Sequence, residues 1–420
     1  MLLKNHKAGI LLFFTAVTIR LAALIATHRL TTPQLWDYEI IATHIVQGKG
    51  FVYPYLDTLY YNYGPLVYPY LCAGVYFLTH HSFLAMTLLQ TVVSAASCVA
   101  AAVLASVLGG VMAGWWAGGL MAIHPGLVYY VTVLHPLNID VLLCLLCLLA
   151  FLYWANHPTV GWGLFVGILS MVSVFSLGSI GLFFPFALVW WWRGGTGSAR
   201  RKFLSLAAWG VGVALSLSPL VVRNARLYHQ LVISRTDNGM NFWYGNNPNA
   251  TGTSYTFHGM EMFDVAPASF KQEVYKADEL GQRDLFYRAA WDFIRQRPTQ
   301  FFKLVARKWF YFWWHSPHQG FLYPKPWTRL YQIFYALLLI FALAGIGILT
   351  RRGTGRVKPV LILILLLLGS VSGVYAFFYV EGRHRWVLEP LLICLASVAL
   401  VRLGKGPTTP AVRTGLRYNK

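Results

Sequence analysis

Two carboxylates lie close together in a chain that has few of them. Asp37 and Glu39 occur in LWDYEIIATHIVQGKGF, residues 35–51, directly after the first long apolar run, and the 420 residues contain only 14 Asp and Glu. A short helix is predicted to open at Pro33, and side chains at i and i+2 of a helix point apart. One acid, held against aromatic residues at a membrane surface, is therefore expected to act as a general base with a raised pKa. The alternative is that both are solvated loop carboxylates.

A basic cluster stands near the other end of the chain. Arg383, His384 and Arg385 lie in YVEGRHRWVLEPLL, residues 379–392. Two arginines at this position can bind a phosphate by charge-assisted hydrogen bonds. The alternative is that they pair with acids of the same segment, Glu381 and Glu389.

A third segment, NGMNFWYGNNPNATGT at residues 238–253, combines amides with aromatic rings. Such combinations are typical of sugar or lipid headgroup sites, and the candidate binding residues are Trp243, Tyr244, Asn246 and Asn247. The alternative is plain turn chemistry, because Asn-Gly and Asn-Pro pairs favour turns.

Isolated polar residues complete the candidates. Arg20 lies in the middle of the first apolar run, where a charge is costly, and is expected to pair with Asp140 or Glu389. Glycines at 110, 114 and 118 form a small-residue face suited to helix packing.

The histidines show no metal-binding motif. His258, His315 and His384 are dispersed along the chain and could still meet in space as metal ligands. No cofactor is therefore certain, and a divalent metal stays possible.

The composition indicates that a polytopic membrane protein carries these side chains. The chain is 57% hydrophobic and 11% charged, with a mean hydropathy of +0.54, whereas about a quarter of the residues in a soluble protein are charged. A membrane-spanning helix needs about 20 apolar residues. The predicted spans are residues 8–28, 82–108, 111–124, 137–154, 161–177, 179–192, 203–222, 328–350, 358–379 and 386–403. Residues 64–79 are expected to form an interfacial or re-entrant helix.

The distribution of charge predicts the orientation. The net charge of +20 comes largely from short basic loops, so nucleic acid is not an expected partner. Residues 193–202, 351–358 and the C-terminal tail fall on one side with Lys4 and Lys7, and none of these loops contains Asp or Glu. Because Lys and Arg mark cytoplasmic loops, both termini are expected in the cytoplasm and the carboxylates on the outer side.

Three parts are expected along the chain. Residues 1–222 form a transmembrane module whose first outer loop, 29–81, carries the candidate base. Residues 223–326 form an extracytoplasmic cap, and residues 327–420 form the C-terminal spans with a short basic cytoplasmic tail.

The motifs together resemble bacterial members of glycosyltransferase family 39, which belongs to the GT-C superfamily and contains the protein O-mannosyltransferases and the aminoarabinose transferase of lipid A. The resemblance lies in Asp37 with the GKGF that follows it, PLVYPYL before the second span, VVRNARLYHQLVISRTDNGMNFWYGNNPNATG, and GRHRWVLEPLLI at the last span. It implies an all-α polytopic membrane protein, a GT-C bundle of about 10–12 transmembrane helices with two large extracytoplasmic loops.

The resemblance also implies roles for the carboxylates. Asp37 matches the catalytic aspartate of the family's first loop. The second carboxylate of the family is represented by Glu39 or by Asp57, and Asp140 stands where family members present an acid in a short outer loop.

The basic cluster resembles the family's Arg-Tyr-Arg motif, with His384 in place of the tyrosine and the following proline displaced to Pro390. Binding of a lipid phosphate by Arg383 and Arg385 is implied.

The implied activity is transfer of a sugar, with inversion, from a polyprenyl-phosphate carrier to a protein, lipid or polysaccharide acceptor outside a bacterial inner membrane. The alternative is a transporter or flippase of lipid-linked sugars, which usually shows inverted repeats and polar sites at the membrane midplane. A third interpretation is an outer scaffold protein, which would not need a carboxylate beside a phosphate site.

Overall fold

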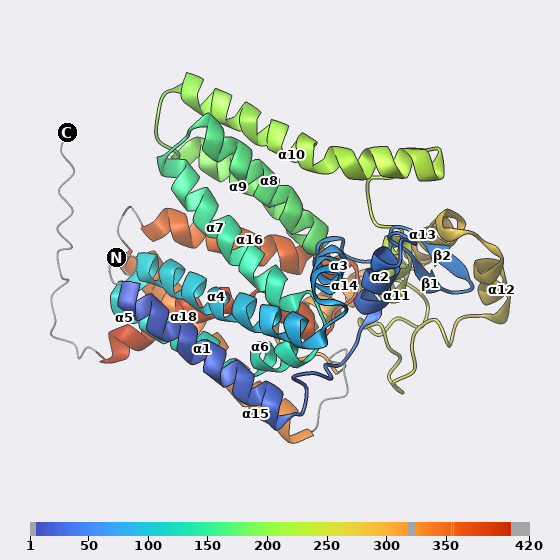
Figure 1. Cartoon of the computed structure of the whole chain (residues 1–420), viewed down its shortest axis with the longest axis horizontal. Helices are drawn as coiled ribbons and strands as arrows, with labels where there is room; N and C mark the ends of the chain where they lie inside the picture. The colour runs from blue at the N-terminus through green and yellow to red at the C-terminus, as the bar shows by residue number, and fades with distance from the viewer. Residues whose placement is uncertain (1–5, 318–324, 354, 356, 405–420) are drawn as a thin grey trace.

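The computed structural model describes residues 6–317, 325–353, 355 and 357–404, and it is an all-α polytopic membrane protein (Figure 1). A helix lies at each predicted span: α1 (His6–Ala26), α4 (Phe83–Gly109), α5 (Val111–Ala122), α7 (Leu137–Asn156), α8 (Val160–Ser176), α9 (Phe183–Gly194), α10 (Ala199–Tyr228), α15 (Lys325–Arg352), α16 (Val357–Phe377) and α18 (Glu389–Gly404). Within the described residues, six of these are long and apolar enough to cross a membrane, namely α1, α4, α7, α10, α15 and α16.

Shorter elements connect these helices. They are α2 (Asp37–Val46), β1 (Tyr53–Tyr55), β2 (Thr58–Tyr60), α3 (Val67–Thr79), α6 (Pro125–Tyr129), η2 (Tyr130–Thr132), η3 (Gly178–Leu182), α11 (Asn238–Gly245), α12 (Ala268–Lys276), α13 (Glu279–Gln296), α14 (Pro298–Trp313) and α17 (Gly382–Trp386). β1 and β2 form an antiparallel hairpin with Tyr53 opposite Tyr60. Figure 1 shows the hairpin, α12 and α13 together at one end of the molecule.

The core of the bundle is built around α18. Its residues from Glu389 to Ala399 are buried, and it packs against α4, α5 and α15. By contrast, α10 packs along α8 and leaves much of its apolar surface exposed, as a helix in contact with lipid does (Figure 1).

The first outer loop is tied to the start of α7. The N–H of Gln34 donates to the Thr132 carbonyl at 2.9 Å, and the N–H of Leu134 donates to the Gln34 carbonyl at 2.9 Å. The prediction of a helix from Pro33 is therefore wrong: α2 begins at Asp37, because the residues before it are engaged in this backbone pairing.

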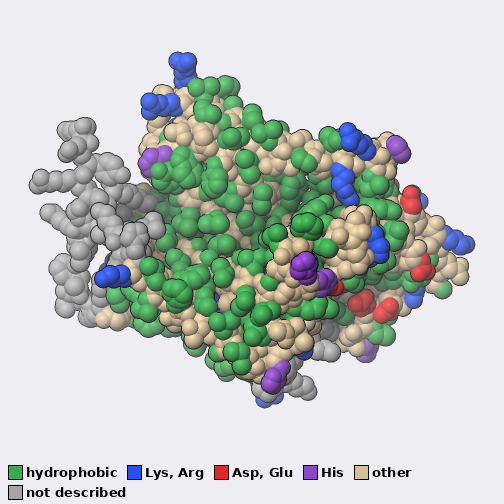
Figure 2. All heavy atoms as spheres, viewed as in Figure 1, with side chains coloured by type: hydrophobic (Ala, Val, Ile, Leu, Met, Phe, Trp, Pro, Cys, Tyr) green, Lys and Arg blue, Asp and Glu red, His purple; other side chains and the backbone are tan. Residues whose placement is uncertain are grey.

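Acidic side chains gather at one end of the molecule. On the face shown in Figure 2 they appear over the end that carries α12, α13 and the hairpin, while hydrophobic side chains cover much of the bundle. The basic loop that precedes α10 lies at the opposite end in Figure 1, as does the C-terminal end of α15. The separation of charge along the sequence is thus also a separation in space.

Arg20 is buried but is not paired as predicted. Its Nε donates to Ser94 Oγ at 2.7 Å and its Nη1 to the Ala122 carbonyl at 3.2 Å. Within the described residues Arg20 has no carboxylate partner, so the expected pairing with Asp140 or Glu389 is wrong. Both acids bind other residues. The Arg20 guanidinium instead donates to carbonyls in the last turn of α5, which receive no hydrogen bond from an N–H of that helix.

Candidate functional site

A cavity of about 420 Å³ lies where the N-terminal end of α7 and the C-terminal ends of α8 and α16 meet the segments that carry α11 and α17. One part of its wall is apolar and comes from the long helices: Met171, Val174, Leu220 and Val374. The other part is polar: Tyr38, Asn62, Asp140, Arg235, Asn241, Arg383 and His384. A cavity with both apolar and polar lining residues suits a ligand that has an apolar tail and a charged, hydroxyl-rich head.

Arg383 joins the two ends of the chain at this cavity. Its Nη2 lies 2.6 Å from Glu381 Oε2, and its guanidinium carbon lies 5.1 Å from the centre of the Trp36 ring. Trp36 directly precedes Asp37. The structure therefore brings the basic cluster and the first outer loop together.

Asp37 is the first residue of α2 and is half-buried. The Tyr63 hydroxyl donates to its Oδ2 at 3.4 Å. Burial raises the pKa of the Asp37 carboxyl, while hydrogen bonds from Tyr53 and Tyr63 and the charge of Arg383 oppose this rise without cancelling it. The side chain does not itself line the cavity, whereas that of the next residue, Tyr38, does.

Glu39 points elsewhere. Its Oε1 lies 3.1 Å from His81 Nε2 and accepts a hydrogen bond from the Thr43 hydroxyl at 2.9 Å. The two acids are thus separated, as the i and i+2 spacing predicts. Neither Glu39 nor Asp57 lines the cavity.

His384 lines the cavity with its ring stacked on Tyr375, the ring centres being 4.2 Å apart. Burial and, next, the charge of Arg383 hold the pKa of His384 well below its ordinary value, so the ring is neutral at pH 7. The Glu381 N–H lies 3.2 Å from Nδ1, which accepts it. The neutral ring therefore carries its hydrogen on Nε2 and is a hydrogen-bond donor there.

Arg235 is a second cation at the cavity, and sequence reasoning missed it. Its Nη2 lies 2.5 Å from Asp237 Oδ2, and the Asn241 amide donates to the same oxygen at 3.0 Å. About 31% of the Arg235 side chain is exposed, so the guanidinium is not closed off by its partner. The only signal in the sequence is its position in the SRTDNG turn directly before α11.

Asp140 was predicted and is present at the cavity. It lies in the first turn of α7, is buried, and accepts a hydrogen bond from the Ser176 hydroxyl at 2.5 Å. A carboxylate with one short hydrogen bond retains acceptor capacity for further hydroxyl groups.

Only the start of the amide and aromatic segment is at the cavity, which Asn238 and Asn241 line. Trp243, Tyr244, Asn246 and Asn247 are buried, and none of them lines it. The Asn246 and Asn247 amides donate to backbone carbonyls of α11 at 2.8 and 2.9 Å, which ends that helix. The buried Lys308 donates to Asn246 Oδ1 at 3.0 Å, and burial lowers the pKa of Lys308 to about 7. The Asn246 and Asn247 amides thus make local backbone contacts, as the turn alternative describes, and their binding role stays a prediction.

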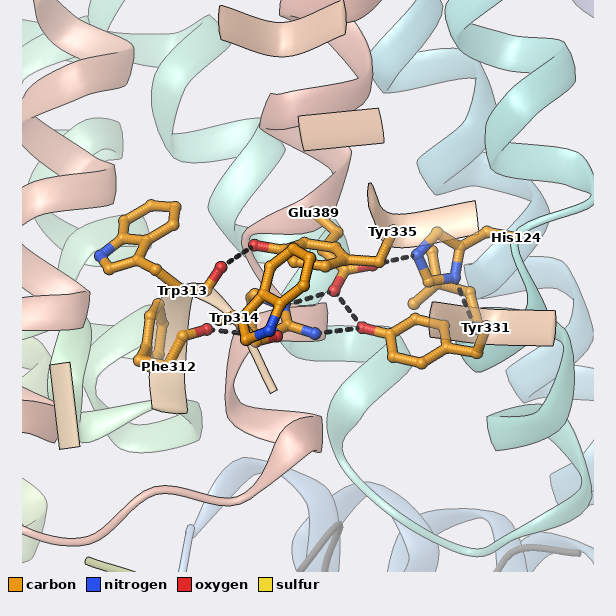
Figure 3. A network of polar contacts seen from close by, with 9 residues as sticks. His124, Phe312, Trp313, Trp314, Tyr331, Tyr335 and Glu389 are labelled. Carbon is orange, nitrogen blue, oxygen red and sulfur yellow. Dashed lines mark hydrogen bonds and ion pairs between the residues drawn. The ribbon is translucent and has the colours of Figure 1, made fainter. Parts of the chain in front are cut away.

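Arg385 faces away from Arg383. It lines a separate cavity of about 240 Å³ with Trp314, Tyr331 and Tyr335, and it belongs to the buried network drawn in Figure 3. The two arginines predicted to bind one phosphate therefore line different cavities.

His258, His315 and His384 do not come together in the part of the chain that the structure describes. His315 contacts the Gln332 amide at 2.8 Å, while His384 stacks on Tyr375. In the part of the chain that the structure describes, no group of three or more His, Cys, Asp or Glu could hold a metal ion. The hypothesis that His258, His315 and His384 meet is therefore wrong.

Comparison with known proteins gives structural relatives. No protein-family model and no curated protein matches the chain. The oligosaccharyltransferase of Archaeoglobus fulgidus in the apo form is similar with a TM-score of 0.53 and 13% identity, over 94% of this chain and 50% of that one. The same enzyme tethered with an acceptor peptide containing the NVT sequon gives 0.50 and 13%, over 92% and 49%. ArnT from Cupriavidus metallidurans, bound to undecaprenyl phosphate, gives 0.37 and 15%, over 94% and 78%.

The chain shares its fold with the archaeal oligosaccharyltransferase. The chain spans about half the length of the archaeal oligosaccharyltransferase that it resembles. The predicted fold class is thereby confirmed, and the narrower assignment to family 39 stays a prediction.

Proposed function

We propose that this chain is an integral-membrane glycosyltransferase of the family 39 type, which moves a sugar from a polyprenyl-phosphate carrier to a hydroxyl of an extracytoplasmic acceptor with inversion. The cavity carries the proposal, because its apolar wall of helix residues adjoins a polar wall with two guanidinium groups. A lipid-linked sugar phosphate needs both surfaces at once. The fold supports the same class, since the archaeal enzyme that shares it is an oligosaccharyltransferase.

The two cations of the cavity fit the leaving group. As the bond between the sugar C1 and the phosphate oxygen breaks, its electron pair goes to the phosphate, which leaves as the polyprenyl phosphate. Arg383 and Arg235 would stabilise that charge, and His384 would donate from Nε2. The role of phosphate ligand is proposed for Arg383 and Arg235, because Arg385 lies at the other cavity.

Asp37 fits the role of general base. The acceptor hydroxyl oxygen forms the new bond to C1 from the face opposite the phosphate, and its proton passes to the Asp37 carboxylate. A raised pKa makes this carboxylate a better base, and the charge of Arg383 opposes part of the rise that burial causes. Asp140 and Asn241 remain to bind hydroxyl groups of the sugar.

The proposal includes an orientation. The cavity lies toward the acidic end of the molecule, and the basic loops lie at the other end (Figures 1 and 2). By the positive-inside rule, the reaction would take place on the extracytoplasmic face of the cell membrane, and both termini would be cytoplasmic. The acceptor is a protein, a lipid or a polysaccharide.

The proposal is tested by measuring the transfer of radioactive sugar from native polyprenyl-phosphate carriers to an acceptor. Membranes containing wild-type protein, Asp37→Asn or Arg383→Ala at equal abundance are compared, with Asp284→Asn as the control because that carboxylate is exposed on α13. We expect transfer by the wild type and the control and loss of transfer in the other two. If the wild type transfers no label but moves the lipid-linked sugar across the bilayer, the flippase alternative replaces this proposal.

A further inference from the structure

A buried polar network lies beside the candidate active site but outside its cavity (Figure 3). At its centre, Glu389 accepts hydrogen bonds from Arg385 Nε at 2.8 Å, from the Tyr331 hydroxyl, and from His124 Nε2 at 2.7 Å. The Leu127 N–H donates to His124 Nδ1 at 3.2 Å, so the hydrogen of a neutral ring is on Nε2, directed at Glu389. One carboxylate thus joins α6, α15 and α17 to α18.

Arg385 extends the network to α14. Its Nη1 donates to the Phe312 and Trp314 carbonyls at 2.8 and 2.7 Å, which are free at the C-terminal end of that helix. Its Nη2 donates to the Tyr331 hydroxyl at 2.7 Å. The side chain is buried and makes contacts that leave little capacity for a further anion. These contacts explain why Arg385 is held away from the larger cavity.

Helix α17 depends on such contacts for its position. It has five residues, far below the length at which a helix is stable alone. Trp386 packs in the same direction as Arg385, against Gly126 of α6 and the Tyr331 ring at 5.2 Å between ring centres. Arg383 and His384 line the larger cavity from the same short helix.

We propose that Glu389, Tyr331 and Arg385 are positioning residues: their network holds α17 so that Arg383 and His384 face the phosphate of the bound donor. The inference rests on the proposed function. It assigns no contact with substrate to the network itself, and it goes beyond the expectation that Arg385 binds phosphate directly.

Two tyrosines on α15 allow a matched test. Tyr331→Phe removes the hydroxyl that bridges Arg385 and Glu389 and leaves the ring in place. Tyr335→Phe removes a hydroxyl one turn further along, which donates only to the Trp313 carbonyl at 2.7 Å. Both variants lose one buried hydroxyl, and only the first loses a hydroxyl that is hydrogen-bonded to Arg385 and Glu389.

The full-length variants are compared in lipid nanodiscs by two measurements, backbone hydrogen exchange and the Kd for undecaprenyl phosphate. In Tyr331→Phe we expect exchange in residues 381–388 to become about fivefold faster and the Kd to rise about fivefold, the scale of one hydrogen bond. Exchange in α4 and α7 should be unchanged, and Tyr335→Phe should match the wild type in both measurements.

Other outcomes overturn the inference. Unchanged exchange in residues 381–388 would show that the network does not hold α17, and faster exchange throughout the chain would show a general role in stability. Faster local exchange with an unchanged Kd would show that the position of α17 does not matter for the donor. If the wild type binds no undecaprenyl phosphate, the proposed function fails, while the exchange data still decide whether the network anchors α17.

Discussion

At the scale of the residue, the activity of the protein should depend on the protonation state of Asp37. Its pKa is raised above the ordinary 3.8 by burial, and a general base must be deprotonated to act. We predict that kcat/KM of the wild type falls as the pH is lowered. The pH at which it falls should lie above the ordinary pKa of an aspartate. Asp37→Asn should lose about 10²- to 10⁴-fold in activity. A profile that stays flat down to pH 4 would contradict the assignment.

The raised pKa of Asp37 also predicts the direction in which the stability of the fold changes with pH. A stability measurement therefore serves as the control. The folded state binds the Asp37 proton more tightly than the unfolded state does, so stability declines as pH rises from the ordinary pKa through the raised one. Asp37→Asn removes a partly buried charge, and its thermal midpoint at pH 7 should equal or exceed that of the wild type. A clearly lower midpoint would mean that lost activity reflects lost folding.

Sequence reasoning found some of the site residues and missed others for physical reasons. Asp37 could be proposed because carboxylates are rare in this chain, and Arg383 because positive charge is disfavoured at the outer end of a span. Arg235 could not, because an arginine two residues before an aspartate in a turn looks like an ordinary local ion pair. The buried state of Asn246 and the partners of Arg385 depend on contacts between segments far apart in the sequence.

At the scale of the element, close contact between α8 and α10 positions one wall of the cavity. A Cβ on Gly167 would lie 2.2 Å from the Trp209 carbonyl oxygen of α10. Backbone cannot yield as a flexible side chain can, so Gly167→Ala should separate the helices and cost at least about 1–3 kcal/mol. Because Leu220 of α10 lines the cavity, binding of undecaprenyl phosphate should weaken as well.

The control for this prediction is Gly161→Ala in the first turn of α8. A Cβ there would meet nothing within 4 Å, and alanine favours a helix over glycine by about 0.5–1 kcal/mol. Thermal midpoints in detergent should therefore fall for Gly167→Ala and stay or rise for Gly161→Ala. Equal midpoints in the two variants would show that the helices are not held by this contact.

The elements themselves were predictable where the membrane dictates them. A span must be apolar and long, so a helix lies at each predicted span, but within the described residues only six of these helices are long and apolar enough to cross a membrane. The start of α2 was not predictable, because a backbone pairing with residues 132–134 keeps Pro33 and Gln34 out of the helix. Of the glycines predicted to form a packing face at 110, 114 and 118, Gly118 packs closely, since a Cβ there would meet Leu12 of α1 at 2.3 Å, whereas a Cβ on Gly110 would meet nothing within 4 Å. The closer glycine contacts between α8 and α10 come from Gly163 and Gly167, which have the same four-residue spacing but were not singled out from the sequence.

At the scale of the whole molecule, the separation of charge predicts which end faces the cytoplasm. All five native cysteines are buried, so a cysteine introduced at the surface reports its own side with little background. Asp284 on α13 is 58% exposed at the acidic end, and Arg201 is exposed at the start of α10 at the basic end. We predict that a membrane-impermeant maleimide added to intact cells labels Asp284→Cys but not Arg201→Cys, and labels both after permeabilisation. The reverse pattern would place the cavity toward the cytoplasm, where a base at Asp37 could not act on an extracytoplasmic acceptor. Orientation therefore decides which pool of lipid-linked sugar and which acceptors Asp37 and Arg383 can reach.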